Sequence, residues 1–339
     1  MNAPGPCCWI CLSHEPPDIE GEPYHRACLM RLFGAPVVPR LDFDRAAVIA
    51  WWGERSGKMS ISGYQPKAPV RLTEDSAALE MVAANATYIL KPQHGTYDST
   101  PENEHLTMRL AEFAGIPVAE CGLFRLTDAS VAYVTRRFDR LGTELSQRLE
   151  HYDFCSLLER DPDDKEDGTA EECAARMRES VSDPEESSRK LFRQFVFAYW
   201  IGNGDMHLKN LALLCGTDDQ WRLSPAYDLL CTDIYGQNTM TLSLRGQNQD
   251  FTRGDWLTFA ERDCRIPRED ARGILAEMAS RLDAMLAMVD RSPLPEARFK
   301  DKMKQLLRLR GEVLLRASTP PTASGTPPPA AASPRTGSG

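Results

Sequence analysis

The stretch that most constrains this chain is a long apolar run that ends abruptly in a polar loop. Residues 191–201 are apolar enough, over a sufficient length, to form a buried helix. Two glycines then interrupt the run, so Asp205 and Asn210, five positions apart, are expected on an exposed loop. A second carboxylate, Asp228, follows after an interval that has the character of a β-hairpin.

This order of groups is what a kinase-type phosphotransferase needs. Asp205 would receive the proton of the acceptor hydroxyl, while Asn210 and Asp228 would hold magnesium against the phosphates. Both metal-site groups are oxygen donors, which Mg²⁺ prefers. An Asp-x4-Asn pattern alone is more often an ordinary polar turn, and it is the second Asp after a hairpin that favours the catalytic interpretation.

Composition excludes several classes of function. With 339 residues the chain is long enough for a two-lobed enzyme, and its net charge of −9 argues against charge-driven nucleic-acid binding by this chain alone. The sequence has no signal-peptide pattern and no apolar stretch long enough to span a bilayer, so we expect a cytoplasmic protein without membrane contact. Six of the ten cysteines are scattered singly, as is typical of reduced thiols.

The other four cysteines crowd the first 28 residues. Cys8 and Cys11 form one pair, and His25 and Cys28 form a second, so together they could hold one tetrahedral Zn²⁺. Cys7 is an extra thiol that leaves the choice of ligands open. The alternative is that Cys28 lies on the apolar face of a short helix with Cys11 packed beside it.

A Ser- and Gly-rich loop is expected upstream of the first predicted strand. Residues 42–55 predict a helix with Asp42 as its cap, and residues 68–72 alternate as a strand. The loop between them could present backbone N–H groups and hydroxyls to a phosphate. Its serines, Ser60 and Ser62, would then be close enough to a γ-phosphate to act as acceptors.

A lysine at the end of a strand supplies the next candidate. Residues 87–91 predict a strand that ends on Lys91, and a helix with an apolar face opens at residues 102–105. Either Glu102 or Glu104 could pair with Lys91, as a helix glutamate does with the strand lysine of kinases. Two solvated charges are the ordinary alternative for such a pair.

The rest of the chain predicts mainly helices. Residues 161–188 are acidic and polar, and we interpret them as a surface insertion with at most one helix around 170–178. Residues 138–140 would leave the second strand of a predicted pair, at 131–137, and form the link between two lobes. Further predictions are strands at 121–124 and 131–137, a hairpin at 210–214 and 221–223, helices at 271–289 and 296–317, and a disordered tail at 318–339.

Seven motifs, taken together and in order, resemble the HipA-like serine/threonine protein kinase toxins. They are SISGYQPK at 60–67, YILK at 88–91, ENEH at 102–105, RRFDR at 136–140, DFC at 153–155, NGDMHLKN at 203–210 and YD at 227–228. The resemblance is closest to the HipT branch, whose chains are short and carry a Ser-Ile-Ser motif. The N-terminal Cys/His segment departs from both branches of the family.

The resemblance implies an α+β fold of the bilobal protein-kinase type, with a small mixed N-lobe and a mainly helical C-lobe. It also implies ATP and Mg²⁺ as cofactors, Asp205 as the catalytic base, and Ser60 and Ser62 as autophosphorylation sites that switch the kinase off. The implied nucleotide-binding residues are Ser62, Gly63, Tyr64, Gln65, Pro66, Lys67, Lys91, Glu104, Arg136, Arg137, Phe138, His207, Lys209, Asn210 and Asp228. The expected domains are a Cys/His segment at 1–40, an N-lobe at 41–140, a C-lobe at 141–317 and the tail at 318–339.

The family also suggests partners. These are a helix-turn-helix HipB-like antitoxin, a separate HipS-like small protein, and an aminoacyl-tRNA synthetase as substrate, with DNA contacted only through the antitoxin. Two alternatives stay open. A small-molecule phosphotransferase of the aminoglycoside or choline kinase type would also fit the loop at 204–210, and a non-catalytic scaffold would need no chemistry, although the intact Lys91, Asp205, Asn210 and Asp228 argue against it.

Overall fold

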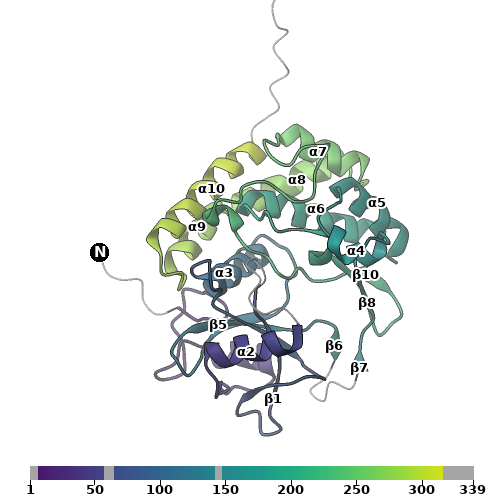
Figure 1. The fold of residues 1–339 in the computed structure, drawn as a ribbon. Coiled ribbons are helices and arrows are strands. Elements are labelled where there is room, and N and C mark those ends of the chain that lie inside the picture. Colours follow the sequence, from purple (N-terminus) through teal and green to yellow (C-terminus); the bar gives the residue numbers. More distant parts are fainter. Residues whose placement is uncertain (1–6, 57–64, 142–146, 316–339) are drawn as a thin grey trace, which may run out of the picture.

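The chain folds into a small lobe built on a β-sheet and a larger helical lobe (Figure 1). The structure, a computed structural model, describes residues 7–56, 65–141 and 147–315. The predictions for Ser60, Ser62, Gly63, Tyr64 and the tail at 318–339 therefore lie outside the described residues. No helix within the described ranges is long and apolar enough to cross a membrane.

The sheet of the small lobe has five antiparallel strands in the order β2-β1-β3-β5-β4. Helices α1 and α2 precede it in the chain, and α3 lies between it and the helical lobe (Figure 1). The elements are α1 (Arg26–Phe33), α2 (Arg45–Ser56), β1 (Ala68–Leu72), β2 (Leu79–Met81), β3 (Tyr88–Pro92), α3 (Thr100–Phe113), β4 (Cys121–Arg125) and β5 (Val131–Arg136).

Alternation along the strands decides what each face of this sheet carries. Val70, Leu90 and Val134 are buried in one apolar cluster together with residues of α1 and α2. Their neighbours Lys91 and Tyr133 point to the opposite face, where α3 packs against β4 and β5. The period of two therefore places Lys91 on the side of the sheet that meets α3 and the helical lobe.

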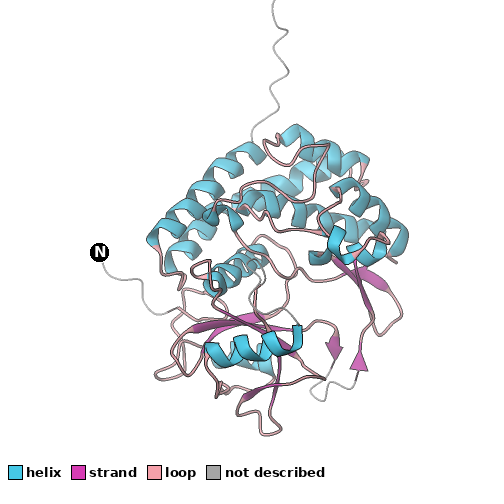
Figure 2. Ribbon diagram, viewed as in Figure 1, coloured by secondary structure: helices cyan, strands magenta, loops and turns pink. Residues whose placement is uncertain are grey.

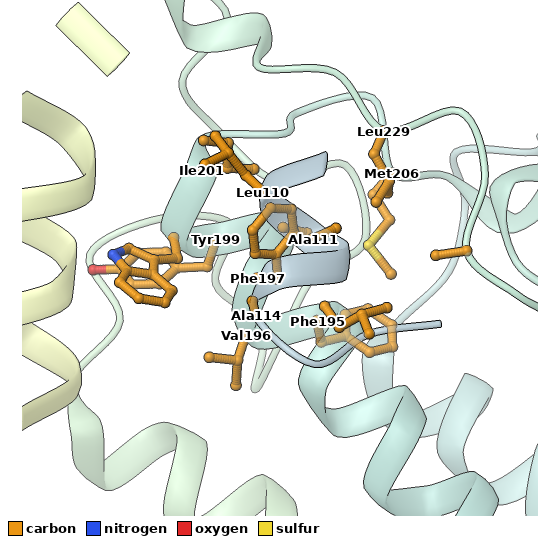
Figure 3. Packing of buried hydrophobic residues seen from close by; sticks show 14 of the residues in the cluster. Leu110, Ala111, Ala114, Phe195, Val196, Phe197, Tyr199, Ile201, Met206 and Leu229 are labelled. Carbon is orange, nitrogen blue, oxygen red and sulfur yellow. The ribbon is translucent and has the colours of Figure 1, made fainter. Parts of the chain in front are cut away.

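The helical lobe surrounds the long helix α6 (Figure 2). At its edge lie a three-stranded sheet in the order β10-β9-β8 and a separate pair of short strands, β6 and β7. Leu110, Ala111 and Ala114 of the α3 segment lie against Phe195 and Phe197 of α6 in the core (Figure 3). The elements of this part are β6 (Arg140–Leu141), β7 (Gln147–Arg148), β8 (His151–Asp153), α4 (Phe154–Leu157), η1 (Pro162–Asp164), α5 (Ala170–Ser180), α6 (Pro184–Ile201), η2 (Leu208–Asn210), β9 (Ala212–Cys215), β10 (Trp221–Leu223), η3 (Thr232–Tyr235), α7 (Arg253–Arg262), α8 (Arg268–Ser280), α9 (Leu282–Arg291) and α10 (Ala297–Leu315).

The structure changes three details of the sequence interpretation. Asp44, and not Asp42, caps α2, because its Oδ1 accepts from the Ala47 backbone N–H at 2.7 Å. The single helix predicted at 271–289 is two helices, since the chain leaves helical geometry at Arg281, whose ψ is 0°. The helix predicted around 170–178 is present as α5, but the stretch at 161–188 contains more helix than predicted, because it also includes η1 and the start of α6.

Candidate active site

The polar loop after α6 is shaped by two glycines that no other residue could replace without strain. Gly202 ends α6 in the left-handed region, with φ of 75°. A Cβ on Gly204 would lie 2.5 Å from the carbonyl oxygen of Thr239, so this position has no room for a side chain. The chain can therefore turn sharply out of the buried helix and expose Asp205 to solvent.

Hydrogen bonds within the loop set the orientation of Asp205 and Asn210. The Asp205 backbone N–H donates to Asn203 Oδ1 at 3.0 Å, and Asn210 Nδ2 donates to the Asp205 carbonyl at 2.8 Å. Because the Asn210 amide uses its nitrogen in this way, its Oδ1 is the atom left to coordinate a cation. The loop thus offers one carboxylate and one amide oxygen.

Lys91 lies between two carboxylates from distant parts of the chain. Its Nζ is 2.8 Å from Glu104 Oε1 on α3 and 2.6 Å from Asp228 Oδ1. The Lys91 and Glu104 side chains are 8% and 2% exposed, whereas Asp228 is 35% exposed and can reach a ligand. The structure therefore shows that Glu104, and not Glu102, pairs with Lys91. Through these two ion pairs Lys91 connects the sheet, α3 and the helical lobe.

Burial and neighbouring charges shift the pKa values of the two carboxylates that flank Lys91. Burial raises the pKa of Glu104 to about 7 although Lys91 opposes the shift. Burial would also raise the pKa of Asp228, but the ammonium groups of Lys91 and Lys67 overcome it and hold the pKa below its ordinary value. Asp228 has a φ of 56°, a left-handed conformation that is uncommon outside glycine and is frequent at functional positions.

Asp205 has the protonation behaviour of a general base. It is exposed to solvent yet closely surrounded by protein atoms, and this desolvation, together with the Asp228 carboxylate, raises its pKa to about 6. A carboxylate with a pKa in this range is mostly ionised at neutral pH and still basic enough to take up a proton. Burial lowers the pKa of His207 to about 4, so this imidazole is neutral at neutral pH.

The donor atoms around Asp228 fit a magnesium–nucleotide complex. Asn210 Oδ1 and the Asp228 carboxylate are hard oxygen ligands of the type that Mg²⁺ selects. Gln65 Nε2, in the predicted phosphate loop, is buried and finds no hydrogen-bond acceptor among the described residues. The charge of Lys67 acts on Lys91, Asp228 and Glu104, which places a second cation near the position where phosphates would lie.

Three of the residues predicted to bind the nucleotide, Arg136, Arg137 and Phe138, lie at the end of β5 and directly after it. Phe138 contacts the ring of Tyr227 at a centroid distance of 5.3 Å. Arg137 is paired with the buried Asp139, with Nη2–Oδ2 at 2.8 Å, and Arg140 pairs with the same carboxylate at 2.7 Å. Asp139 thus anchors this segment, while the predicted role of Arg137 in binding the nucleotide stays a prediction, as does that of the half-buried Arg136.

Lys209, which was predicted to bind the nucleotide, pairs with a carboxylate of the helical lobe in this structure. Its Nζ is 2.9 Å from Asp153 Oδ2, and the other oxygen of Asp153 caps α4 by accepting from the Ser156 N–H. The Lys209 carbonyl accepts the Tyr227 hydroxyl at 2.7 Å. Lys209 therefore ties the loop to α4 and to the residue before Asp228.

Lys165 is a charged residue near the loop that the sequence interpretation missed. The Leu208 N–H donates to the Lys165 carbonyl at 3.0 Å, and Gly168 packs so closely on Leu208 that a Cβ there would come within 2.9 Å. The positive charge of Lys165 partly opposes the rise in the pKa of Asp205, and it adds to the lowering of the pKa of His207. A single lysine in an acidic stretch carries no sequence pattern that would have revealed this placement.

The N-terminal Cys/His set is also brought together. The ligand atoms of Cys8, Cys11, His25 and Cys28 all lie within 4.8 Å of one another. Cys7 is outside this group, because it is buried in the larger hydrophobic core.

Comparison with known proteins agrees with this arrangement. Residues 59–286 match the family model of the HipA-like C-terminal domain. A Haemophilus influenzae protein named "Putative kinase" is 29% identical over 218 residues, which cover 61% of this chain and 63% of that protein. The Sinorhizobium fredii protein "Putative kinase Y4mE" is 31% identical over 257 residues, covering 72% of this chain and 58% of the relative. The match thus spans less than two thirds of the length of these relatives.

Two solved structures share the fold. HipA of the Shewanella oneidensis toxin–antitoxin system, solved with HipB and its operator DNA, aligns with a TM-score of 0.65 at 20% identity, covering 81% of this chain and 72% of that chain. The Helicobacter pylori proinflammatory kinase CtkA aligns with a TM-score of 0.52 at 16% identity, covering 70% of this chain and 90% of that chain. The predicted bilobal kinase-like fold is therefore confirmed, and the chain belongs to the family of the HipA-like C-terminal domain.

Proposed function

We propose that this protein is an ATP- and Mg²⁺-dependent serine/threonine protein kinase that acts as the toxin of a toxin–antitoxin module. The observation that carries the proposal is the position of Lys91 between Glu104 and Asp228, near Lys67 and the Asp205–Asn210 loop. These are the groups needed to grip phosphates, hold magnesium and accept a proton. The names of the relatives as kinases support the same chemistry.

In the proposed mechanism each residue has one task. Lys91, held by Glu104, would bind the phosphates of ATP, and Asn210 Oδ1 with Asp228 would hold Mg²⁺. The metal, when bound, would neutralise charge on the transferring phosphoryl group. Asp205 would orient the acceptor hydroxyl and receive its proton, for which a pKa of about 6 is suitable.

We propose further that the kinase limits itself through Ser60 and Ser62. A phosphate on either serine would add about two negative charges beside the triphosphate site, which would weaken ATP binding by repulsion. The Ser-Ile-Ser motif is also our reason for proposing the HipT branch. The boundaries of the lobes, at residues 41–140 and 141–317, are part of this proposal.

The proposed partners follow from the family. The Shewanella HipA structure contains HipB and operator DNA, and this supports a HipB-like antitoxin through which the chain would meet DNA. A HipS-like small protein and an aminoacyl-tRNA synthetase substrate are proposed from the HipT resemblance alone. A Zn²⁺ ion at the four-residue Cys/His set would be structural, since a full set of four protein ligands leaves no open position for a substrate.

Identifying the phosphate acceptor tests the proposal against a small-molecule phosphotransferase. Purified protein is incubated with γ-labelled ATP and Mg²⁺, and phosphopeptides are mapped by mass spectrometry. Phosphate on Ser60 or Ser62, absent in the Asp228→Asn variant, is expected. ATP turnover that depends on an added aminoglycoside or choline, with no phosphoprotein, would favour the alternative.

A further inference from the structure

The N-terminal Cys/His set has the dimensions of a tetrahedral zinc site. The distance from His25 Nδ1 is 3.5 Å to Cys11 Sγ and 3.7 Å to Cys28 Sγ. Zinc bonds of about 2.3 Å to sulfur and about 2.0 Å to nitrogen, at tetrahedral angles, require sulfur–nitrogen separations of about 3.5 Å. The remaining ligand, Cys8 Sγ, lies within 4.8 Å of the others.

A hydrogen bond fixes which nitrogen of His25 faces the thiols. His25 Nε2 is 2.9 Å from the Pro16 carbonyl, and a carbonyl can only accept, so Nε2 must carry the proton. The lone pair is then on Nδ1, the atom that approaches Cys11 and Cys28. Metal-binding histidines are oriented by such a bond from the second ring nitrogen. Three sulfurs and one imidazole favour Zn²⁺ over Mg²⁺ or Ca²⁺.

The segment that carries these ligands is attached to the part of the small lobe that holds Glu104. The Ile10 carbonyl, between the two ligands Cys8 and Cys11, lies 3.0 Å from Nε2 of the fully buried His105 on α3. The Ile10 side chain fills the space above Gly122, where a Cβ would lie 2.8 Å from Ile10 Cγ1. His105 directly follows Glu104 in the sequence.

The same segment also covers the edge of the sheet. β4 is an edge strand, and its Leu123 N–H donates to the Trp9 carbonyl at 3.0 Å, while the Leu123 carbonyl accepts the Tyr24 hydroxyl at 2.9 Å. Arg291 of α9 donates to the Leu12 carbonyl, which adds a contact with the helical lobe. The segment thus contacts α3, β4 and α9 through backbone groups next to the Cys8–Cys11 pair.

We propose that Cys8, Cys11, Cys28 and His25 Nδ1 bind one Zn²⁺, and that the metal makes residues 8–28 a clamp that fixes β4 and α3. Apart from α1 the segment has no regular secondary structure of its own. Metal coordination can supply the folding free energy that such a short segment lacks. Without the ion, the loop that carries the Trp9 and Ile10 carbonyls would no longer be held in place, and their hydrogen bonds to Leu123 and His105 would weaken.

Metal content is the first test, and it does not depend on phosphotransfer. Elemental analysis of protein purified without chelators should give about one zinc per chain. Cys11→Ser and Cys28→Ser should lose most of it, and the matched control Cys7→Ala should keep it, because Cys7 lies outside the set. His25→Cys should also keep the ion, since it preserves a four-ligand set. Folded wild-type protein without zinc would overturn the proposal.

Hydrogen exchange is the second test, and it uses the wild-type chain, so that an unfolded variant cannot obscure the answer. Removing zinc with EDTA should speed exchange of the Leu123 amide by at least about tenfold, while amides of the central strand β3 stay protected. Adding Co²⁺ in its place should restore protection and give the charge-transfer absorption of thiolate–cobalt bonds. Unchanged exchange at Leu123 after complete zinc removal would refute the clamp. A zinc-bound protein without kinase activity would leave the clamp intact and contradict only the proposed function.

Discussion

Replacing Glu104 by glutamine should make the protein more stable at pH 8 and less active. Glu104 is 2% exposed, and burial raises its pKa from an ordinary value of 4.5 to about 7. This difference in pKa is equivalent to about 3–4 kcal/mol, at about 1.4 kcal/mol for each tenfold change in proton affinity. Because the folded state holds this proton more tightly than the unfolded state does, stability falls as pH rises from 4.5 to 7.

The Glu104→Gln variant removes the buried negative charge and keeps the Oε1 acceptor for Lys91. We therefore expect its free energy of unfolding to exceed that of the wild type by about 1–3 kcal/mol at pH 8, with the difference shrinking toward zero near pH 4.5. Activity should fall by about 10- to 100-fold, because a charge-assisted hydrogen bond of about 1.5–3 kcal/mol to Lys91 is weakened.

Urea unfolding of both proteins at pH 8 and near pH 4.5, followed by ATP turnover at pH 8, measures both effects. Equal slopes of free energy against urea would show that the two proteins unfold alike. A variant that is less stable than the wild type at pH 8 would refute the reasoning, because it would mean that the Lys91–Glu104 pair stabilises the fold by more than the burial of the carboxylate costs.

Three further predictions concern the loop. Phosphotransfer should fall as pH is lowered through about 6, the pKa of Asp205, because the protonated acid cannot act as a base; a flat profile between pH 5 and 8 would contradict the assignment. Lys165→Met should move that midpoint to higher pH, since the Lys165 charge lowers the pKa of Asp205, and an unmoved midpoint in the pH–rate profile would exclude its influence. Lys209→Met should leave ATP affinity within about twofold and cost at most about 1 kcal/mol of stability, because Lys209 is 39% exposed and its ion pair with Asp153 is screened by solvent; a tenfold loss in calorimetric ATP affinity would instead make Lys209 a phosphate ligand.

Periodic patterns in the sequence correctly predicted the strand that carries Lys91 and the helix that carries Glu104. Alternation in β3 puts Lys91 on the face of the sheet that meets α3, where Glu104 pairs with it. The choice between Glu102 and Glu104 stayed open because both lie in the first turn of a helix whose rotation depends on packing. Asn103, between them, hydrogen-bonds to the backbone of Cys231, and this contact from the helical lobe fixes the rotation.

Contacts between segments that are distant in sequence could not be predicted. Nothing near Lys209 in the sequence indicates that Asp153 will pair with it, and nothing near Lys165 indicates its closeness to Asp205. The break at Arg281 was missed because the residues on both sides of it favour helix, and only the packing of α8 and α9 demands the bend.

The central claim is that Asp205 performs the proton transfer while Lys91, Asn210 and Asp228 hold the nucleotide. Single-turnover transfer from γ-labelled ATP, measured beside ATP affinity for wild type and Asp205→Asn, tests it most directly. The account predicts a loss of about 10²- to 10⁴-fold in the rate of transfer with ATP affinity unchanged. Transfer by Asp205→Asn at the wild-type rate would contradict it.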